Sequence, residues 1–242
     1  MRANAIEARG FAQVILSDIE ALELMIERGE VPELAALALH NGTVWRWNRT
    51  CYWVTDGKPH LRIENRVLPG GPTVLDEVAN AALFYGLMVR LDDQYGDVSE
   101  RVFFTDAKNN LLSAARRGLH GRFQWLDGRH VVARDLLMQE LIPAAREGLV
   151  QLGVAGKDVE RYIGVIEQRV QSDRTGARWL LQNLAMVSED ERVEHCSAAV
   201  RMMLEKQQLN EPVHTWQHIR HVPVEDMQGK VVGLLTAREV LH

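Results

Sequence analysis

Cysteine is scarce in this chain of 242 residues, and its scarcity argues against two kinds of scaffold. Only Cys51 and Cys196 occur, far apart in sequence, so we predict neither a disulfide framework nor a cysteine metal cluster. No apolar run approaches the roughly 18 residues that a membrane helix needs. The first ten residues, MRANAIEARG, contain no apolar signal core. We therefore expect a cytoplasmic protein with no membrane partner.

An excess of positive charge is also missing. The formal net charge is -5, so bulk electrostatics gives no reason to expect a nucleic-acid partner. The composition, 46% hydrophobic and 25% charged, is that of an ordinary globular protein. The length suits one large domain or two small ones.

The amino-terminal third predicts a helix followed by a β-hairpin. Apolar residues recur at helical spacing over residues 11–28, and a glycine follows them. Residues 43–53 are rich in β-branched and aromatic side chains, which favours a strand. Asp56-Gly57 is a strong hairpin-turn signal, and residues 60–67 return as the partner strand.

The chain between the LPGGP break and residue 208 is expected to be almost entirely helical. Thr73 and Asp76 approximate a capping box at the start of this region. Asp106 is expected to cap a helix that ends at Gly118, and Pro143 is expected to kink or split a later one. The remaining predicted helices cover about 131–152, 158–171 and 175–187, and one that begins at the Ser188–Glu191 capping box.

The last part of the chain has a different residue pattern from the helical region before it. Val222 and Val224 precede an acidic turn, VVGLL follows as a strand, and a short helix is expected from Thr236. We divide the chain into residues 1–208 and 209–242. The second part is too short for a core of its own, so it must pack on something else. The predicted fold class is α+β: an antiparallel hairpin or small sheet packed against a mainly helical body, with a C-terminal ββα remnant.

The predicted hairpin carries charge at every second position: His60, Arg62, Glu64 and Arg66. Side chains two apart on a strand are about 6.5–7 Å from each other, so Glu64 is within electrostatic reach of both arginines. The preceding strand adds Arg46 and Arg49 among tryptophans. Arginine forks match carboxylates and phosphates, and a carboxylate among them can hold a divalent ion that bridges phosphates. An anion site and a merely solvated strand face both remain open.

Three segments carry a resemblance to a known family. They are HNGTVWRWNRTCY, then HLRIENRVLPGGPTVLDEVANAALFYGLM, and DAKNNLLSAARRGL. Together they resemble the carboxylate–amine ligases of the second glutamate–cysteine ligase family, in the branch whose chains end in CBS domains. The resemblance extends from the start of the chain to about residue 208. Within it, Thr50 stands where the family usually has proline, and Ser113 where many relatives have a basic residue.

The resemblance implies ATP-dependent amide formation with Mg²⁺, of the kind used in glutathione biosynthesis. Glutamate would be phosphorylated to an acyl phosphate, which the amine of cysteine or another small molecule attacks. Glu64 would be a catalytic residue and a metal or substrate-amine ligand, and Arg66 would be a catalytic clamp for a carboxylate or phosphate. The expected substrate and nucleotide contacts are Arg49, Arg46, Arg62, Arg116 and Asn110.

The family's amino-terminal metal-binding strands and its His-Val-His strand have no match in residues 1–40. We therefore expect a chain that begins midway through the ligase fold. The alternative hypothesis is a non-catalytic or regulatory module that binds an anion, a nucleotide or a partner protein. A hairpin without partner strands leaves a bare edge, which predicts a homo-oligomer.

The tail resembles the second half of a CBS motif. The segment is HIRHVPVEDMQGKVVGLLTAREVL. In that motif a Thr-x-x-Asp/Glu pattern contacts a ribose and a phosphate, and the matching residues are Thr236 and Glu239. CBS motifs work in pairs, so packing on the helical body is the favoured interpretation of this tail.

Overall fold

The computed structural model describes residues 25, 27–32, 34, 37, 48–68, 70–96, 98–185, 187, 189, 192–219, 221–225, 228 and 231–236. Contacts divide the chain into two compact units, residues 1–69 and 70–242, and each is described by itself. Some predictions lie outside the described residues: most of the helix at 11–28, the strand residues 43–47 and the Ser188–Glu191 cap. The predicted division at 208/209 rests on family resemblance and stays a prediction.

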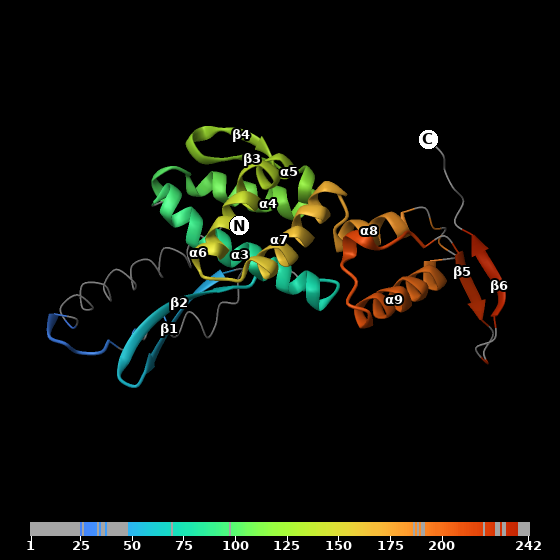
Figure 1. Ribbon diagram of the computed structural model, residues 1–242, viewed down its shortest axis with the longest axis horizontal. Helices are drawn as coiled ribbons and strands as arrows, with labels where there is room; N and C mark the ends of the chain where they lie inside the picture. The colour runs from blue at the N-terminus through green and yellow to red at the C-terminus, as the bar shows by residue number, and fades with distance from the viewer. Residues whose placement is uncertain are drawn as a thin grey trace, which may run out of the picture. The chain divides into compact units, whose positions relative to one another are not determined.

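The first unit contains the predicted hairpin, formed by β1 (Asn48–Thr55) and β2 (Lys58–Asn65) (Figure 1). The strands are antiparallel, and Thr55 pairs with Lys58 across a two-residue turn. Asp56 and Gly57 both have positive φ, 51° and 73°, as a type I′ turn requires. The Asp-Gly signal is therefore confirmed, and it fixes the register of every pair in the hairpin.

The core of the second unit is built from α3 (Val74–Tyr95), α6 (Ile142–Gln151) and α7 (Gly156–Gln171), which pack against one another (Figure 1). Ala79, Ala145 and Ile163 are fully buried among them. The crossing of α3 and α6 is very close, because a Cβ built on Gly148 would overlap the carbonyl oxygen of Gly86. Small residues at this crossing therefore permit near backbone contact.

A buried carboxylate ties three segments of the second unit together. Thr73 caps α3 as predicted, since its Oγ1 accepts from the Asp76 backbone N–H and donates to Asp76 Oδ2. Arg169 Nη2 on α7 lies 2.6 Å from Asp76 Oδ1, and the Val213 backbone N–H donates to Asp76 Oδ2 at 3.1 Å. Asp76 is 0% exposed. Buried charges persist only when paired and hydrogen-bonded, and this one meets both conditions.

Helix α4 (Phe104–Arg117) and a short hairpin lie between α3 and α6 in sequence. The helix ends at Gly118 as predicted, but its N-cap is Phe103 and not Asp106. Asp106 lies instead in the first turn, where a carboxylate still interacts favourably with the helix dipole. The prediction of an Asp106 cap was therefore wrong by one turn.

The predicted helix at 131–152 is interrupted. Strand β3 (Arg122–Gln124) pairs with β4 (His130–Val132), so Val131 and Val132 belong to a hairpin. Helix α5 (Ala133–Leu136) continues through a π-helical segment, Leu137–Leu141, before α6 begins. Pro143 lies in the first turn of α6 and has no backbone N–H to donate to the carbonyl group four residues earlier. The proline therefore splits the helix, as predicted, and the π segment accommodates it.

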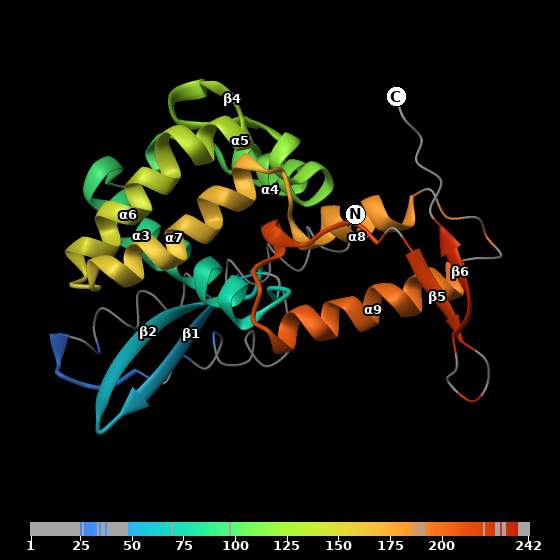
Figure 2. The same ribbon diagram turned by 45° about the vertical axis from the view of Figure 1, so that its right-hand side comes forward.

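The carboxy-terminal part packs through two tryptophans. Helices α8 (Gly176–Leu184) and α9 (Arg192–Gln208) lie beside each other, as Figure 2 shows. Trp179 of α8 and Trp216 meet edge to face, with ring centroids 5.0 Å apart. Their indole N–H groups donate to the carbonyls of Gln217 and Glu211. The segment after residue 208 therefore packs on the helices, as expected of a tail without a core of its own.

The chain continues into β5 (His221–Glu225) and β6 (Val231–Thr236), which form the predicted antiparallel pair (Figure 2). Thr236 is the last residue of β6, and the residues after it, where a short helix was predicted, lie outside the described residues. The α+β fold class is confirmed by the small antiparallel hairpins and the mainly helical second unit. In the part of the chain that the structure describes, no helix combines the length and apolarity that a membrane crossing requires.

Candidate functional site

The hairpin places several predicted site residues at one side of its two strands. The register pairs Arg49 with Glu64 and Cys51 with Arg62. Residues directly opposite each other in an antiparallel pair occupy the same side of the sheet, so these four positions share one face. The alternating charge pattern of the sequence is thus matched by the backbone. Arg46 lies outside the described residues.

Glu64 lies between a guanidinium and a thiol. Arg66 Nε is 3.2 Å from Glu64 Oε1, and the Cys51 thiol donates to Glu64 Oε2 across 3.8 Å. Cys51 is buried, whereas the Glu64 side chain is 37% exposed. An ion pair at this exposure contributes little stability, about 0–1 kcal/mol. The carboxylate remains accessible from solvent, and that is the property a ligand-binding group needs.

The surrounding hairpin residues are largely solvent-exposed. Arg62 is exposed, and the Thr55 hydroxyl lies 3.2 Å from His60 Nε2 further along the same side. Trp53 is also exposed and pairs with His60 in the register. Cationic and aromatic groups therefore continue along this face away from Glu64.

The other two predicted contacts lie on α4 in the second unit. Asn110 donates from Nδ2 to the Gln124 carbonyl at 2.8 Å and accepts from the Gln124 N–H at 2.9 Å. Its amide thus holds β3 against α4. Arg116 is exposed in the last turn. Six residues turn an α-helix by about 600°, so the structure does not bring Asn110 and Arg116 to the same face. Their roles in binding stay predictions.

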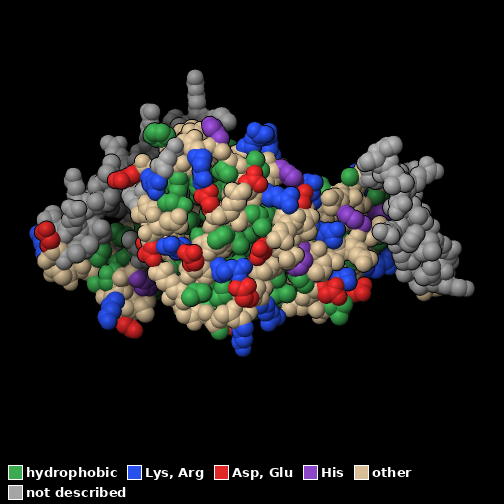
Figure 3. Space-filling model, turned by 45° about the horizontal axis from the view of Figure 1, so that its top comes forward, with side chains coloured by type: hydrophobic (Ala, Val, Ile, Leu, Met, Phe, Trp, Pro, Cys, Tyr) green, Lys and Arg blue, Asp and Glu red, His purple; other side chains and the backbone are tan. Residues whose placement is uncertain are grey.

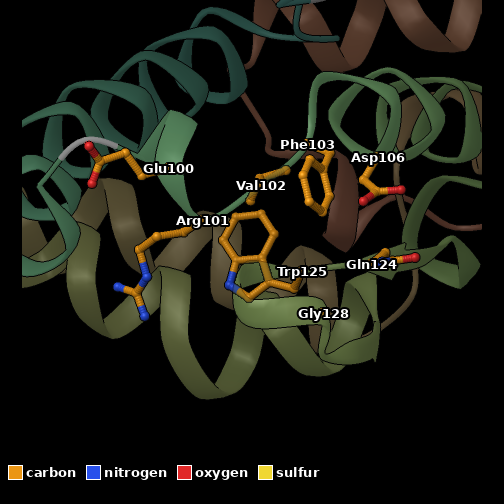
Figure 4. A pocket seen from close by; sticks show the side chains of 8 residues that line it. All are labelled: Glu100, Arg101, Val102, Phe103, Asp106, Gln124, Trp125 and Gly128. Atoms are coloured by element: carbon orange, nitrogen blue, oxygen red, sulfur yellow. The ribbon is translucent and has the colours of Figure 1, made fainter.

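A pocket of about 330 Å³ opens where α4 begins, and sequence reasoning did not find it. It is lined by Glu100, Arg101, Val102, Phe103, Asp106, Gln124, Trp125 and Gly128 (Figure 4). The missed signal was in FQWLDGRH, where Asp127-Gly128 repeats the Asp-Gly turn signal of the first hairpin. Gly128 has a φ of 75°, which suits its place between β3 and β4.

The CBS-like residues fall at the edge of the described chain. Thr236 ends β6, and Glu239 lies outside the described residues. On the face in Figure 3, acidic and basic side chains are interspersed over the described surface. No group of three or more His, Cys, Asp or Glu side chains among the described residues is arranged to hold a metal ion.

These observations define an α+β protein whose first unit carries a hairpin with Glu64, Arg66 and Arg62 along it. A model of glutamate-cysteine ligase family 2 (GCS2) matches residues 15–206, and the chain therefore belongs to this family. No curated protein and no solved structure matches the chain significantly. The family suggests a carboxylate–amine ligase with small-molecule substrates. The CBS-like tail lies beyond the matched residues, and its resemblance stays a prediction.

Proposed function

We propose that the chain takes part in ATP-dependent amide-bond formation between the γ-carboxylate of glutamate and the amine of cysteine or a similar small molecule. The carboxylate attacks the γ-phosphorus of ATP, which forms γ-glutamyl phosphate and releases ADP. The amine then attacks the acyl carbon and loses a proton, and inorganic phosphate leaves. The single observation that carries the proposal is the accessible Glu64 carboxylate beside Arg66, within the residues that the ligase family model matches.

Arg66 and the arginines at nearby positions bind and stabilise the negative charge of the substrates. A guanidinium fork binds carboxylate or phosphate oxygens in a fixed orientation and stabilises negative charge that is being transferred. Arg49 pairs with Glu64 in the register, and Arg62 occupies the next position on the same face. Reactions of this kind depend on orienting charged reactants, and no covalent protein nucleophile is needed.

The Glu64 carboxylate suits a magnesium site in which it is one of several ligands. Mg²⁺ is usually bound through one or two carboxylates together with substrate phosphates, so a single accessible carboxylate suits the donor set. The ion would neutralise phosphate charge when it is bound. The proximity of Arg66 keeps Glu64 oriented, and the buried Cys51 thiol contacts its other oxygen. Asn110 and Arg116 are proposed as further substrate or nucleotide contacts.

The test is ADP release by the purified chain with Mg-ATP, glutamate and cysteine, with each substrate omitted in turn. Glu64→Gln removes the charge and keeps the shape. Glu140→Gln is the matched control, because Glu140 also pairs with an arginine, Arg129, at 2.7 Å and partial exposure. We expect glutamate-dependent release that falls at least about 100-fold in Glu64→Gln and stays unchanged in Glu140→Gln.

Two outcomes would overturn the proposal. One is glutamate-dependent turnover that survives in Glu64→Gln. The other is the absence of turnover together with glutamate or ATP binding that Glu64→Gln leaves intact. The second outcome would favour the alternative hypothesis, a non-catalytic module that binds an anion or a partner protein.

A further inference from the structure

The pocket at the start of α4 combines two aromatic rings with two carboxylates. Phe103 and Trp125 supply the rings, and Glu100 and Asp106 supply the carboxylates. Figure 4 shows the Phe103 ring beside Asp106 and above the Trp125 indole, with Arg101 on the other side of that indole. These residues come from the turn before α4, its first turn and the β3–β4 loop. Segments distant in sequence therefore converge on one small cavity.

The aromatic side chains are exposed in a way that packing does not explain. Phe103 is 80% exposed although it is the N-cap residue of α4, where polar side chains are usual. Trp125 is partly buried, and its Nε1 is buried with no hydrogen-bond partner in the part of the chain that the structure describes. The exposed Phe103 ring is thus available to a small guest.

Arg101 and Asp106 lie on opposite sides of the pocket, and Glu100 lies on the Arg101 side (Figure 4). The Arg101 guanidinium lies over the Tyr95 ring, 5.1 Å from its centroid, and Tyr95 does not line the cavity. Asp106 lies on the Phe103 side. Its carboxylate also offsets the positive end of the α4 dipole, which would otherwise favour an anion. A carboxylate next to aromatic faces attracts an organic cation by both ion pairing and cation–π interaction.

We propose that this pocket binds a small organic cation with a primary ammonium head. The ammonium N–H groups donate to Asp106, and the attached methylene chain lies against Phe103 and Trp125. The volume of about 330 Å³ is at the small end of ligand pockets, which limits the guest to a small molecule. The proposal concerns binding alone and does not depend on the ligase reaction.

Three probes with closely similar chains separate charge from apolar contact. They are n-butylammonium, n-butyrate and n-butanol, each titrated into the whole chain labelled with ¹⁵N. The readout is the indole N–H resonance of Trp125, assigned with Trp125→Phe. We expect n-butylammonium to shift this resonance saturably and the other two to leave it in place. A shift caused equally by n-butanol, or only by butyrate, would overturn the proposal.

Variants test the assignment to Asp106. Asp106→Asn is expected to weaken n-butylammonium binding by about tenfold, since hydrogen bonds to charged groups are the strong ones. Phe103→Ala is expected to weaken it by about fivefold. Asp158→Asn is the matched control, because Asp158 occupies the first turn of α7 with similar burial and lies outside the pocket. Equal weakening by Asp158→Asn, or no binding in the wild type, would overturn the proposal.

Discussion

Two carboxylate–arginine pairs, one in each unit, differ in how they are surrounded. Asp76 and Arg169 approach to 2.6 Å, and Asp76 is fully buried with donors on both carboxylate oxygens. Glu64 and Arg66 are 3.2 Å apart on the hairpin, where Glu64 keeps access to solvent. A buried pair whose carboxylate is hydrogen-bonded at both oxygens holds structure together, whereas an accessible pair can exchange its partner for a ligand. From this difference in environment we infer different roles for the same two chemical groups.

The largest effect is expected at the buried pair. Asp76→Asn leaves the Arg169 guanidinium buried without a counter-charge, which costs about 3–5 kcal/mol of unfolding free energy. For a chain of this size that lowers the melting temperature by about 6–20 °C. Thermal unfolding followed by helical circular dichroism measures it, with Glu140→Gln as an exposed-pair control. A loss below about 1 kcal/mol would contradict a structural role for Asp76.

The next largest effect on stability is expected at the close crossing of α3 and α6 in the second unit. Gly148→Ala places a methyl group against the Gly86 carbonyl, and overpacking of this kind costs about 1–3 kcal/mol. Gly164→Ala is the matched control, since nothing lies within 4 Å of a Cβ built there. It should stabilise α7 by about 0.5–1 kcal/mol. Urea titration of both variants distinguishes the two results, and equal effects would contradict the close crossing.

A smaller effect is expected from pH next to the Asp76–Arg169 pair. Burial is the main cause that lowers the pKa of His214, opposed by Asp76 and supported by Arg169 and Arg174. The unfolded chain therefore binds the His214 proton more readily than the folded chain. With respect to His214, the folded chain is therefore most stable above pH 6.5, the ordinary pKa of histidine. It loses this stability as the pH falls through that value toward the lowered pKa.

His214→Gln should flatten the stability decline below pH 6.5, because glutamine does not titrate in this range. His218→Gln, at an exposed position on the same segment, is the control. Urea midpoints between pH 5 and pH 8 provide the measurement. A decline equally steep in His214→Gln would show that His214 is not the group responsible.

The smallest effect on stability is expected at the accessible pair. Glu64→Gln removes an ion pair that contributes about 0–1 kcal/mol, so the unfolding midpoint should hardly move. The same substitution is expected to have the largest effect on the proposed chemistry. A large loss of stability in Glu64→Gln would place the two pairs in the same structural class and remove the contrast between them.

Local chemistry made part of the fold predictable. The Asp56-Gly57 turn, the Thr73 cap and the split at Pro143 each follow from the backbone preferences of a few adjacent residues. Val131 and Val132 were assigned to a helix because the Asp127-Gly128 turn signal, which makes them the return strand of a hairpin with β3, was missed. Asp106 was placed at the cap for its side-chain type, although the helix begins two residues earlier, at Phe104.

The candidate site was likewise predictable from the sequence only in part. The alternation along β2 and the family motif pointed to Glu64 and Arg66, which the structure places in contact. The ties of Asp76 to Arg169 and Val213 were not predictable, because they join residues about 90 and 140 positions away. The α4 pocket was missed for the same reason, since its lining comes from separate segments that only tertiary packing brings together.

The most direct test measures glutamate-dependent ADP release per folded molecule in Glu64→Gln and Asp76→Asn, assayed side by side below both melting temperatures. We predict that Glu64→Gln keeps the wild-type melting temperature and loses at least about 100-fold in turnover. We predict that Asp76→Asn loses stability and retains turnover. Wild-type turnover in Glu64→Gln, or abolished turnover in folded Asp76→Asn, would contradict the division of roles between the two pairs.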